Sequence, residues 1–150
     1  MSHHKRSSSG LLVAAVVAAV AGSGCSGPEP ADLFLVQRGG SIAGARLTLR
    51  ISDDGGAYCN GGPRRQITSA QLIEARALRR ALDGEKDSDV GLAERHIHLG
   101  PGQVTTLHYR VRSEQGAVAF YDTSPRQPAA FYRLARLTRD VAQGTCHLPR

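Results

Sequence analysis

The chain has 150 residues, of which 41% are hydrophobic and 21% charged, and its formal net charge at neutral pH is +6. A chain of this length has room for one compact domain with its own core, and the composition excludes a fibrous or low-complexity protein. The arginines are scattered from Arg38 to Arg150 and aromatic residues are sparse. This pattern predicts a solvated, mixed surface and no nucleic-acid partner.

The first 25 residues have the three zones of a secretion signal. A basic start with Lys5 and Arg6 precedes an unbroken apolar run of 11 residues, Leu11 to Ala21, and small residues then lead to Cys25. A permanent membrane span takes about 20 apolar residues, so this run is too short to be one. The sequence therefore predicts export to the outer side of a bacterial cytoplasmic membrane.

Two processing sites compete at the end of the signal. Ala19-Val20-Ala21 fits the A-x-A rule for ordinary secretion. Gly22-Ser23-Gly24-Cys25 resembles a lipobox, in which the cysteine is diacylated and becomes the first residue, although Gly22 stands where a lipobox usually has an aliphatic residue. The first site gives a secreted protein, and the second a lipoprotein anchored in the membrane.

The number of cysteines favours the lipoprotein. The chain has three, Cys25, Cys59 and Cys146, and plain secretion would leave one reactive thiol in an oxidising compartment. Lipidation of Cys25 leaves a pair. We therefore expect a disulfide between Cys59 and Cys146, which would close a loop of about 88 residues and stabilise the domain by roughly 4–5 kcal/mol.

Residues 26–32 are predicted to be a polar linker, and residues 33–150 a single domain whose first part is strand-rich. Leu33–Arg38 is apolar and strand-like, and Gly39-Gly40 should end it. Residues 45–51 alternate between apolar and polar side chains, as a half-buried strand does. Asp53-Asp54-Gly55-Gly56 then predicts a hairpin that returns along residues 57–59, followed by a loop from Asn60.

Two helices and two further strands follow. Thr68-Ser69-Ala70-Gln71 is a capping box that should begin a helix ending at Gly84, and residues 85–102 are expected to form a long irregular loop. Residues 104–112 and 117–121 predict two strands, and Pro128 the first position of a second helix that ends at Gly144. The whole order, βββαββα, predicts an α+β fold: an antiparallel sheet of four or five strands with two helices on one face.

The sequence contains no recognisable catalytic or metal-binding motif. His96 and His98 would point to one side of an extended segment, but no nearby carboxylate or cysteine completes a ligand set. No serine has a G-x-S-x-G context, and the glycine-rich stretches do not form a phosphate-binding loop. We expect no enzyme activity, no metal and no cofactor.

One stretch resembles a known family. Val36-Gln37-Arg38-Gly39-Gly40-Ser41-Ile42-Ala43-Gly44, a strand running into a Gly-Gly turn, is similar to the opening of the emfourin family, small protein inhibitors of thermolysin-like metalloproteases related to the inhibitor of protealysin. The order of elements over residues 33–143 is similar too. Typical members lack the signal and the two later cysteines, and residues 84–103 are longer here. The chain also resembles short actinobacterial lipoproteins.

The resemblance implies a binding domain that inhibits a secreted or envelope metalloprotease, which the predicted anchor would tether to the membrane. We expect a monomer. The alternative is an envelope lipoprotein that binds a partner or ligand without inhibiting anything. An inhibitor of this kind would present a loop to the protease cleft, and the candidate loops are 39–44, 60–65 and 85–102. The candidate binding residues within them are Gly39, Gly40, Ser41, Ile42, Asn60, Arg64 and Arg65.

Overall fold

The computed structural model describes residues 31–85 and 90–148. The predicted signal, the lipidation site Cys25 and most of the linker lie outside the described residues, so these remain predictions. The elements in chain order are β1 (Asp32–Gly40), β2 (Leu47–Ser52), β3 (Gly56–Cys59), β4 (Arg65–Gln66), α1 (Ser69–Asp83), β5 (Leu107–Ser113), β6 (Gly116–Tyr121) and α2 (Ala129–Gly144).

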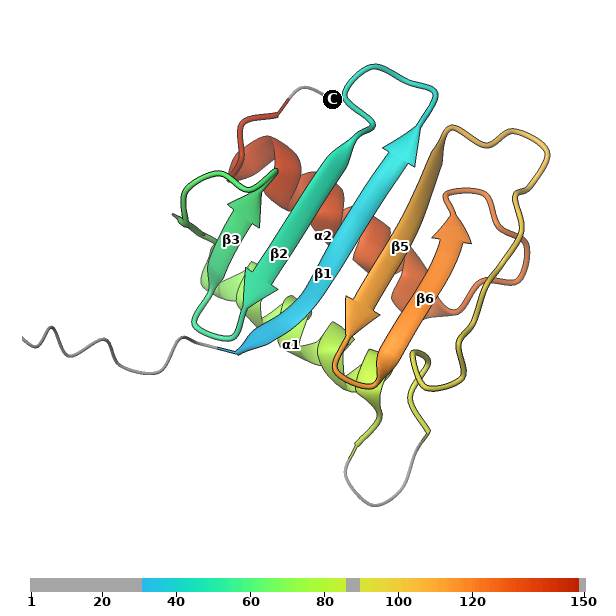
Figure 1. Ribbon diagram of the computed structural model, residues 1–150, viewed down its shortest axis with the longest axis horizontal. Coiled ribbons are helices and arrows are strands. Elements are labelled where there is room, and N and C mark those ends of the chain that lie inside the picture. Colours follow the sequence, from blue (N-terminus) through green and yellow to red (C-terminus); the bar gives the residue numbers. More distant parts are fainter. Residues whose placement is uncertain (1–30, 86–89, 149–150) are drawn as a thin grey trace, which may run out of the picture.

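The strands form one antiparallel sheet in the order β4-β3-β2-β1-β5-β6. Both helices lie behind this sheet in Figure 1, and no helix of the described residues covers its other face, which we call the open face. The α+β prediction is confirmed, with six strands in place of four or five. The additional strand is β4, whose two residues, Arg65 and Gln66, are too few to produce an alternating pattern.

The first strand of the chain occupies the middle of the sheet. Val36 of β1 lies opposite Leu49 of β2 on one side and Val111 of β5 on the other. β1 includes both glycines and ends at Gly40, two residues beyond the predicted last strand residue, Arg38. A Cβ at Gly40 would lie 2.0 Å from the Thr106 carbonyl oxygen, so glycine is needed where the chain entering β5 approaches most closely.

The core lies between the sheet and the helices. Alternate strand residues point to the helix side and are buried, and each helix contributes an apolar stripe. Rings from three elements stack within it: Tyr109 lies 5.0 Å from Phe120, and Phe120 lies 4.5 Å from Phe131, measured between ring centroids. The largest fully buried side chains are Phe34, Phe120, Phe131, Leu47, Leu49, Ile51, Leu78, Leu82 and Leu134, with Val36, Val111 and Val118.

The helix ends follow the sequence signals closely. Thr68 and Gln71 form the predicted capping box of α1, which satisfies N–H groups that the first turn leaves free. Gly84 ends α1 with a positive φ of 80°, a backbone conformation that glycine adopts without strain. Pro128 sits one position before α2, at its N-cap, and not at the first helical position as predicted.

The long connection between α1 and β5 covers one edge of the sheet. The Leu99 N–H donates to the Ala119 carbonyl, and the Ala119 N–H donates to the Ile97 carbonyl, both at 2.9 Å. These bonds occupy part of the free edge of β6, which otherwise could pair with another chain. The predicted strand from residue 104 begins only at Leu107, and Val104 is 74% exposed.

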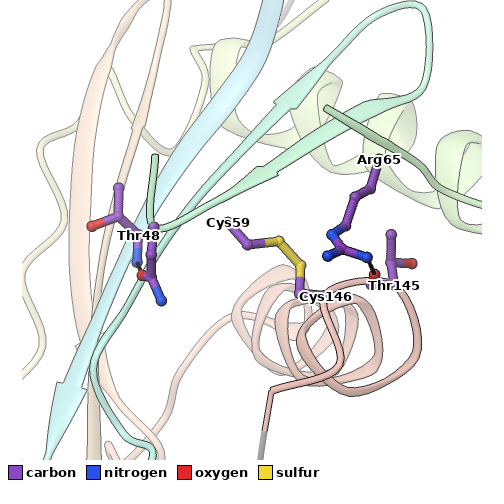
Figure 2. The surroundings of a disulfide bond; sticks show 6 residues. Thr48, Cys59, Arg65, Thr145 and Cys146 are labelled. Carbon is purple, nitrogen blue, oxygen red and sulfur yellow. Dashed lines mark hydrogen bonds between the residues drawn. A yellow bond between two sulfur atoms is a disulfide. The ribbon is translucent and has the colours of Figure 1, made fainter. Parts of the chain in front are cut away.

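The predicted disulfide is present. Cys59 at the end of β3 is bonded to Cys146, two residues beyond α2, with the two Cα atoms 6.2 Å apart. Figure 2 shows the bond spanning from the sheet to the end of α2, with Arg65 directed at the carbonyl of Thr145. The bond therefore ties the last helix to the part of the sheet farthest from β6.

Candidate functional site

A pocket with a volume of about 610 Å³ lies at the end of the sheet where β1 turns into β2, on the helix side. This size is within the range of small-molecule sites. Its floor comes from β1 and β5, one wall from the β1–β2 loop, and the other from α2. The lining residues are Arg38, Ile42, Ala43, Gly44, Ala45, Leu107, Tyr109, Asp122, Gln127, Tyr132, Ala135, Arg136, Arg139, Ala142 and Gln143.

Arg38 is the unusual residue of this pocket. The alternation of β1 directs Phe34, Val36 and Arg38 to the helix side, so a guanidinium stands where the strand otherwise presents apolar side chains, and it is only 8% exposed. Its Nε donates to the Ala45 carbonyl at 2.9 Å and its Nη2 to the Gly44 carbonyl at 3.0 Å. No carboxylate of the described residues lies within 4.0 Å of it, so its charge is buried without a counter-ion.

Two more arginines stand at the mouth of the pocket. Arg136 and Arg139 are exposed residues of α2, on the face of the helix that also presents Ala135 and Ala142 to the pocket. Arg139 is three or four positions away from each of the other three residues, so all four lie along one side of α2. The helix therefore has one row of side chains in the core and a second row along the pocket. The small alanines leave space between α2 and the β1–β2 loop, and the arginines place positive charge beside it.

The polar groups at the inner end are held by the surrounding structure. Asp122 accepts hydrogen bonds from the Thr106 hydroxyl at 2.6 Å and from the Leu107 N–H at 3.1 Å, so it fixes the start of β5. Burial raises the pKa of the Tyr109 hydroxyl, against the opposing influence of the Arg38 charge. Tyr109 therefore remains a neutral hydroxyl at physiological pH, and the three arginines outnumber the one carboxylate of the lining.

The β1–β2 loop is braced from both sides. The Ser41 N–H donates to the Thr106 carbonyl and the Ala45 N–H to the Ile42 carbonyl, each at 3.1 Å, while Arg38 holds the carbonyls of the last two loop residues from beneath. Among the predicted binding residues, Ser41 and Ile42 lie in this loop, and Ile42 is 45% exposed and lines the pocket. Gly39 and Gly40 belong instead to β1.

The other predicted binding residues make contacts within the domain. The Asn60 side chain accepts a hydrogen bond from the Thr48 N–H at 2.9 Å. Arg64 forms an ion pair with Asp54 at 2.8 Å, and Arg65 is in β4, with its guanidinium 3.5 Å from the Thr145 carbonyl. These three side chains hold the β3–β4 region together and do not line the pocket.

The histidines do not gather. His98 lies beside β6 and forms a bridge with Ala119, whereas His108 of β5 stands over Gly39. Within residues 31–85 and 90–148, no group of three or more His, Cys, Asp or Glu side chains is placed to hold a metal ion. No helix in that part of the chain is long and apolar enough to cross a membrane.

Comparison with known proteins identifies no relative: no family model, no curated protein and no solved structure matches this chain. The pocket's own geometry therefore carries the functional argument.

Sequence reasoning did not predict the pocket, although one signal was present. Arg38 shares its face of β1 with Phe34 and Val36, so the alternation alone places a cation on the apolar side. The sequence contains no comparable indication that α2 lines the pocket, because Arg136 and Arg139 have the pattern of solvated residues on the polar side of an amphipathic helix.

Proposed function

We propose that this chain is an exported, membrane-tethered binding domain, without a catalytic role, that holds a small molecule with an apolar body and an anionic head in the pocket between α2 and the β1–β2 loop. The buried guanidinium of Arg38 carries the proposal. Burying such a charge without a counter-ion costs free energy, and an anionic ligand would supply the missing charge.

The remainder of the lining matches such a ligand. Ile42, Ala45, Leu107 and Ala135 offer apolar surface for the body, and burying that surface favours binding. Arg136 and Arg139 would attract an anion towards the mouth of the pocket. Of the five N–H groups of a guanidinium, Arg38 uses two on backbone carbonyls and also interacts with the Tyr109 hydroxyl, so donors remain for a carboxylate or phosphate.

Calorimetric titration with three probes of equal chain length tests the proposal. Decanoate and decyl phosphate should bind, and decanol should bind at least tenfold more weakly because it lacks the charge. Arg136→Gln combined with Arg139→Gln should weaken decanoate several-fold, whereas Arg80→Gln, on the exposed surface of α1, should not. Equal affinity for decanol and decanoate, or no binding of any probe, would refute the proposal.

Arg38→Met is the more direct variant, but it also removes the brace of the β1–β2 loop. Its binding is therefore compared at a temperature where circular dichroism shows the variant to be folded. A folded Arg38→Met protein that binds decanoate as tightly as the parent would also contradict the proposal.

Inhibition of a thermolysin-like metalloprotease is a second proposal, supported by the β1–β2 loop. Ile42 presents an exposed aliphatic side chain on a loop that Arg38 and Thr106 hold in place, and a loop already ordered loses little entropy on binding. An assay against a panel of thermolysin-type proteases tests it: the parent should inhibit, Ile42→Asp should not, and Ile73→Asp, at an exposed position of α1, should match the parent. No inhibition by the parent excludes this activity and leaves the pocket proposal standing.

A further inference from the structure

The open face of the sheet carries a cluster of arginines from two separate parts of the sequence. Arg50 of β2 and Arg112 of β5 both lie opposite Leu35 of β1, so they flank the central strand about 10 Å apart. Arg110 lies two residues before Arg112 on β5. Arg46, one residue before β2 begins, continues the outward alternation of Arg50 and Thr48. This face is the one towards the viewer in Figure 1.

Several arginines outside the open face are paired with carboxylates of the domain. On the helix side, Arg133 pairs with Glu74 at 2.7 Å, and Arg76 pairs with Asp53 at 2.8 Å. On the open face, Arg46, Arg110 and Arg112 have no carboxylate of the described residues within 4.0 Å, and Arg50 has Asp32 at 3.5 Å.

The outward positions of the strands, together with Arg46 just before β2, therefore present four arginines and, among the described residues, one carboxylate, that of Asp32. The rest of this face suits a flat, anionic surface. Tyr58, whose ring lies 4.0 Å from the Arg50 guanidinium, stands towards one side of the face, and Tyr121 towards the other. Tyrosines are enriched at membrane–water interfaces, where the ring meets apolar groups and the hydroxyl meets water. The arginine-bearing strands β2 and β5 lie between these two tyrosines, and beside Tyr121 the outward positions of β6 hold the small residues Ala117 and Ala119.

The start of β1 places this face close to the predicted membrane anchor. Six residues lie between Cys25 and Asp32, so the seven steps from one Cα atom to the next reach at most about 25 Å. A domain held so close to a bilayer can lay one of its faces on the headgroups. On the open face, Arg46, Arg110 and Arg112 point outwards without an ion-pair partner among the described residues, so positive charge is available there.

We propose that the open face of the sheet docks on the anionic phospholipid headgroups of the membrane in which the chain is anchored. The arginines favour an anionic partner whether or not the chain is tethered. The predicted tether is the reason to expect a membrane and not a soluble polyanion. Docked in this way, the domain turns α1 and α2 away from the bilayer and leaves the wall of the pocket that α2 forms accessible from the aqueous side.

Vesicle sedimentation with the exported chain carrying Cys25→Ser tests the docking without an acyl anchor. This protein should bind vesicles of equal parts phosphatidylglycerol and phosphatidylcholine, bind pure phosphatidylcholine far more weakly, and lose affinity as salt is raised. Arg110→Gln with Arg112→Gln should reduce binding about thirtyfold, taking about 1 kcal/mol for each basic residue near an anionic surface.

The matched control removes two other charges. Arg80→Gln on α1 with Arg126→Gln, in the loop that leads from β6 to α2, has the same net charge and should bind as the parent does. Equal losses in the two double variants, or no preference for phosphatidylglycerol, would overturn the proposal. Binding to soluble polyglycerol phosphate as tight as binding to vesicles, at equal phosphate concentration, would also overturn it and assign the face to a soluble polyanion.

Discussion

Removing the disulfide should destabilise the domain by several kcal/mol without disturbing the pocket. Cys59 and Cys146 are separated by 87 positions, and the loss of chain entropy for a closed loop of that length corresponds to about 4.6 kcal/mol at 25 °C. Natural domains are stable by about 5–15 kcal/mol, so the bond would supply a third or more of the total. The entropy of unfolding of a domain of about 120 residues is about 250 cal/mol/K, so Tm should fall by about 18 °C.

The double variant Cys59→Ala, Cys146→Ala is compared with the parent by thermal and urea unfolding. Cys25→Ala is the matched control, because it removes a cysteine outside the described domain and should leave Tm unchanged. Reduction of the parent should reproduce the Tm of the double variant. Decanoate affinity at 10 °C should be kept, since neither cysteine lines the pocket. A decrease in Tm of less than about 5 °C would refute the entropic reasoning. Loss of decanoate binding in a folded double variant would show that the disulfide shapes the pocket.

Three further predictions concern stability. Leu134→Ala should cost about 2–5 kcal/mol in a urea titration, because the side chain is fully buried; a cost near zero would mean that α2 is not seated on the sheet. Arg133 lowers the pKa of Glu74, so the ionised carboxylate stabilises the fold above its ordinary pKa, and this contribution disappears as the pH falls through the lowered pKa. Glu74→Gln should therefore cost about 0.5–1 kcal/mol at pH 7 and nothing at pH 2. A difference in stability that persists at pH 2 would contradict this. Thr68→Ala should cost about 1 kcal/mol, and an unchanged urea midpoint would show that the α1 cap is dispensable.

The parts of the fold that sequence reasoning predicted well are those specified by neighbouring residues. Thr68 and Gln71 define the start of α1 within four positions, and Gly84 ends it, so the helix needs no tertiary information. The cysteine pair was inferred by counting. Gly39-Gly40 shows the limit of such local signals, because the two glycines exist for the approach of β5, about 70 residues further along the chain.

The candidate sites depend on the sheet order, which no local pattern specifies. Arg46 and Arg50 belong to one part of the sequence and Arg110 and Arg112 to another, and this separation indicated scattered charges. The placement of β1 between β2 and β5 brings them onto one face. The pocket likewise needs the angle at which α2 crosses the sheet, and this angle follows from the packing of Phe131 and Leu134 in the core.

The central position of β1 has a mechanical consequence for a protein held by its N-terminus. The tether would transmit tension into Asp32 and along β1, which pairs with both β2 and β5. The interstrand hydrogen bonds run perpendicular to the strands, so tension along β1 loads the bonds on both sides in shear, and many must break together before the strand slides. An edge strand pulled sideways would instead open one bond at a time. The topology therefore gives the predicted tether a strand that is hydrogen-bonded on both sides.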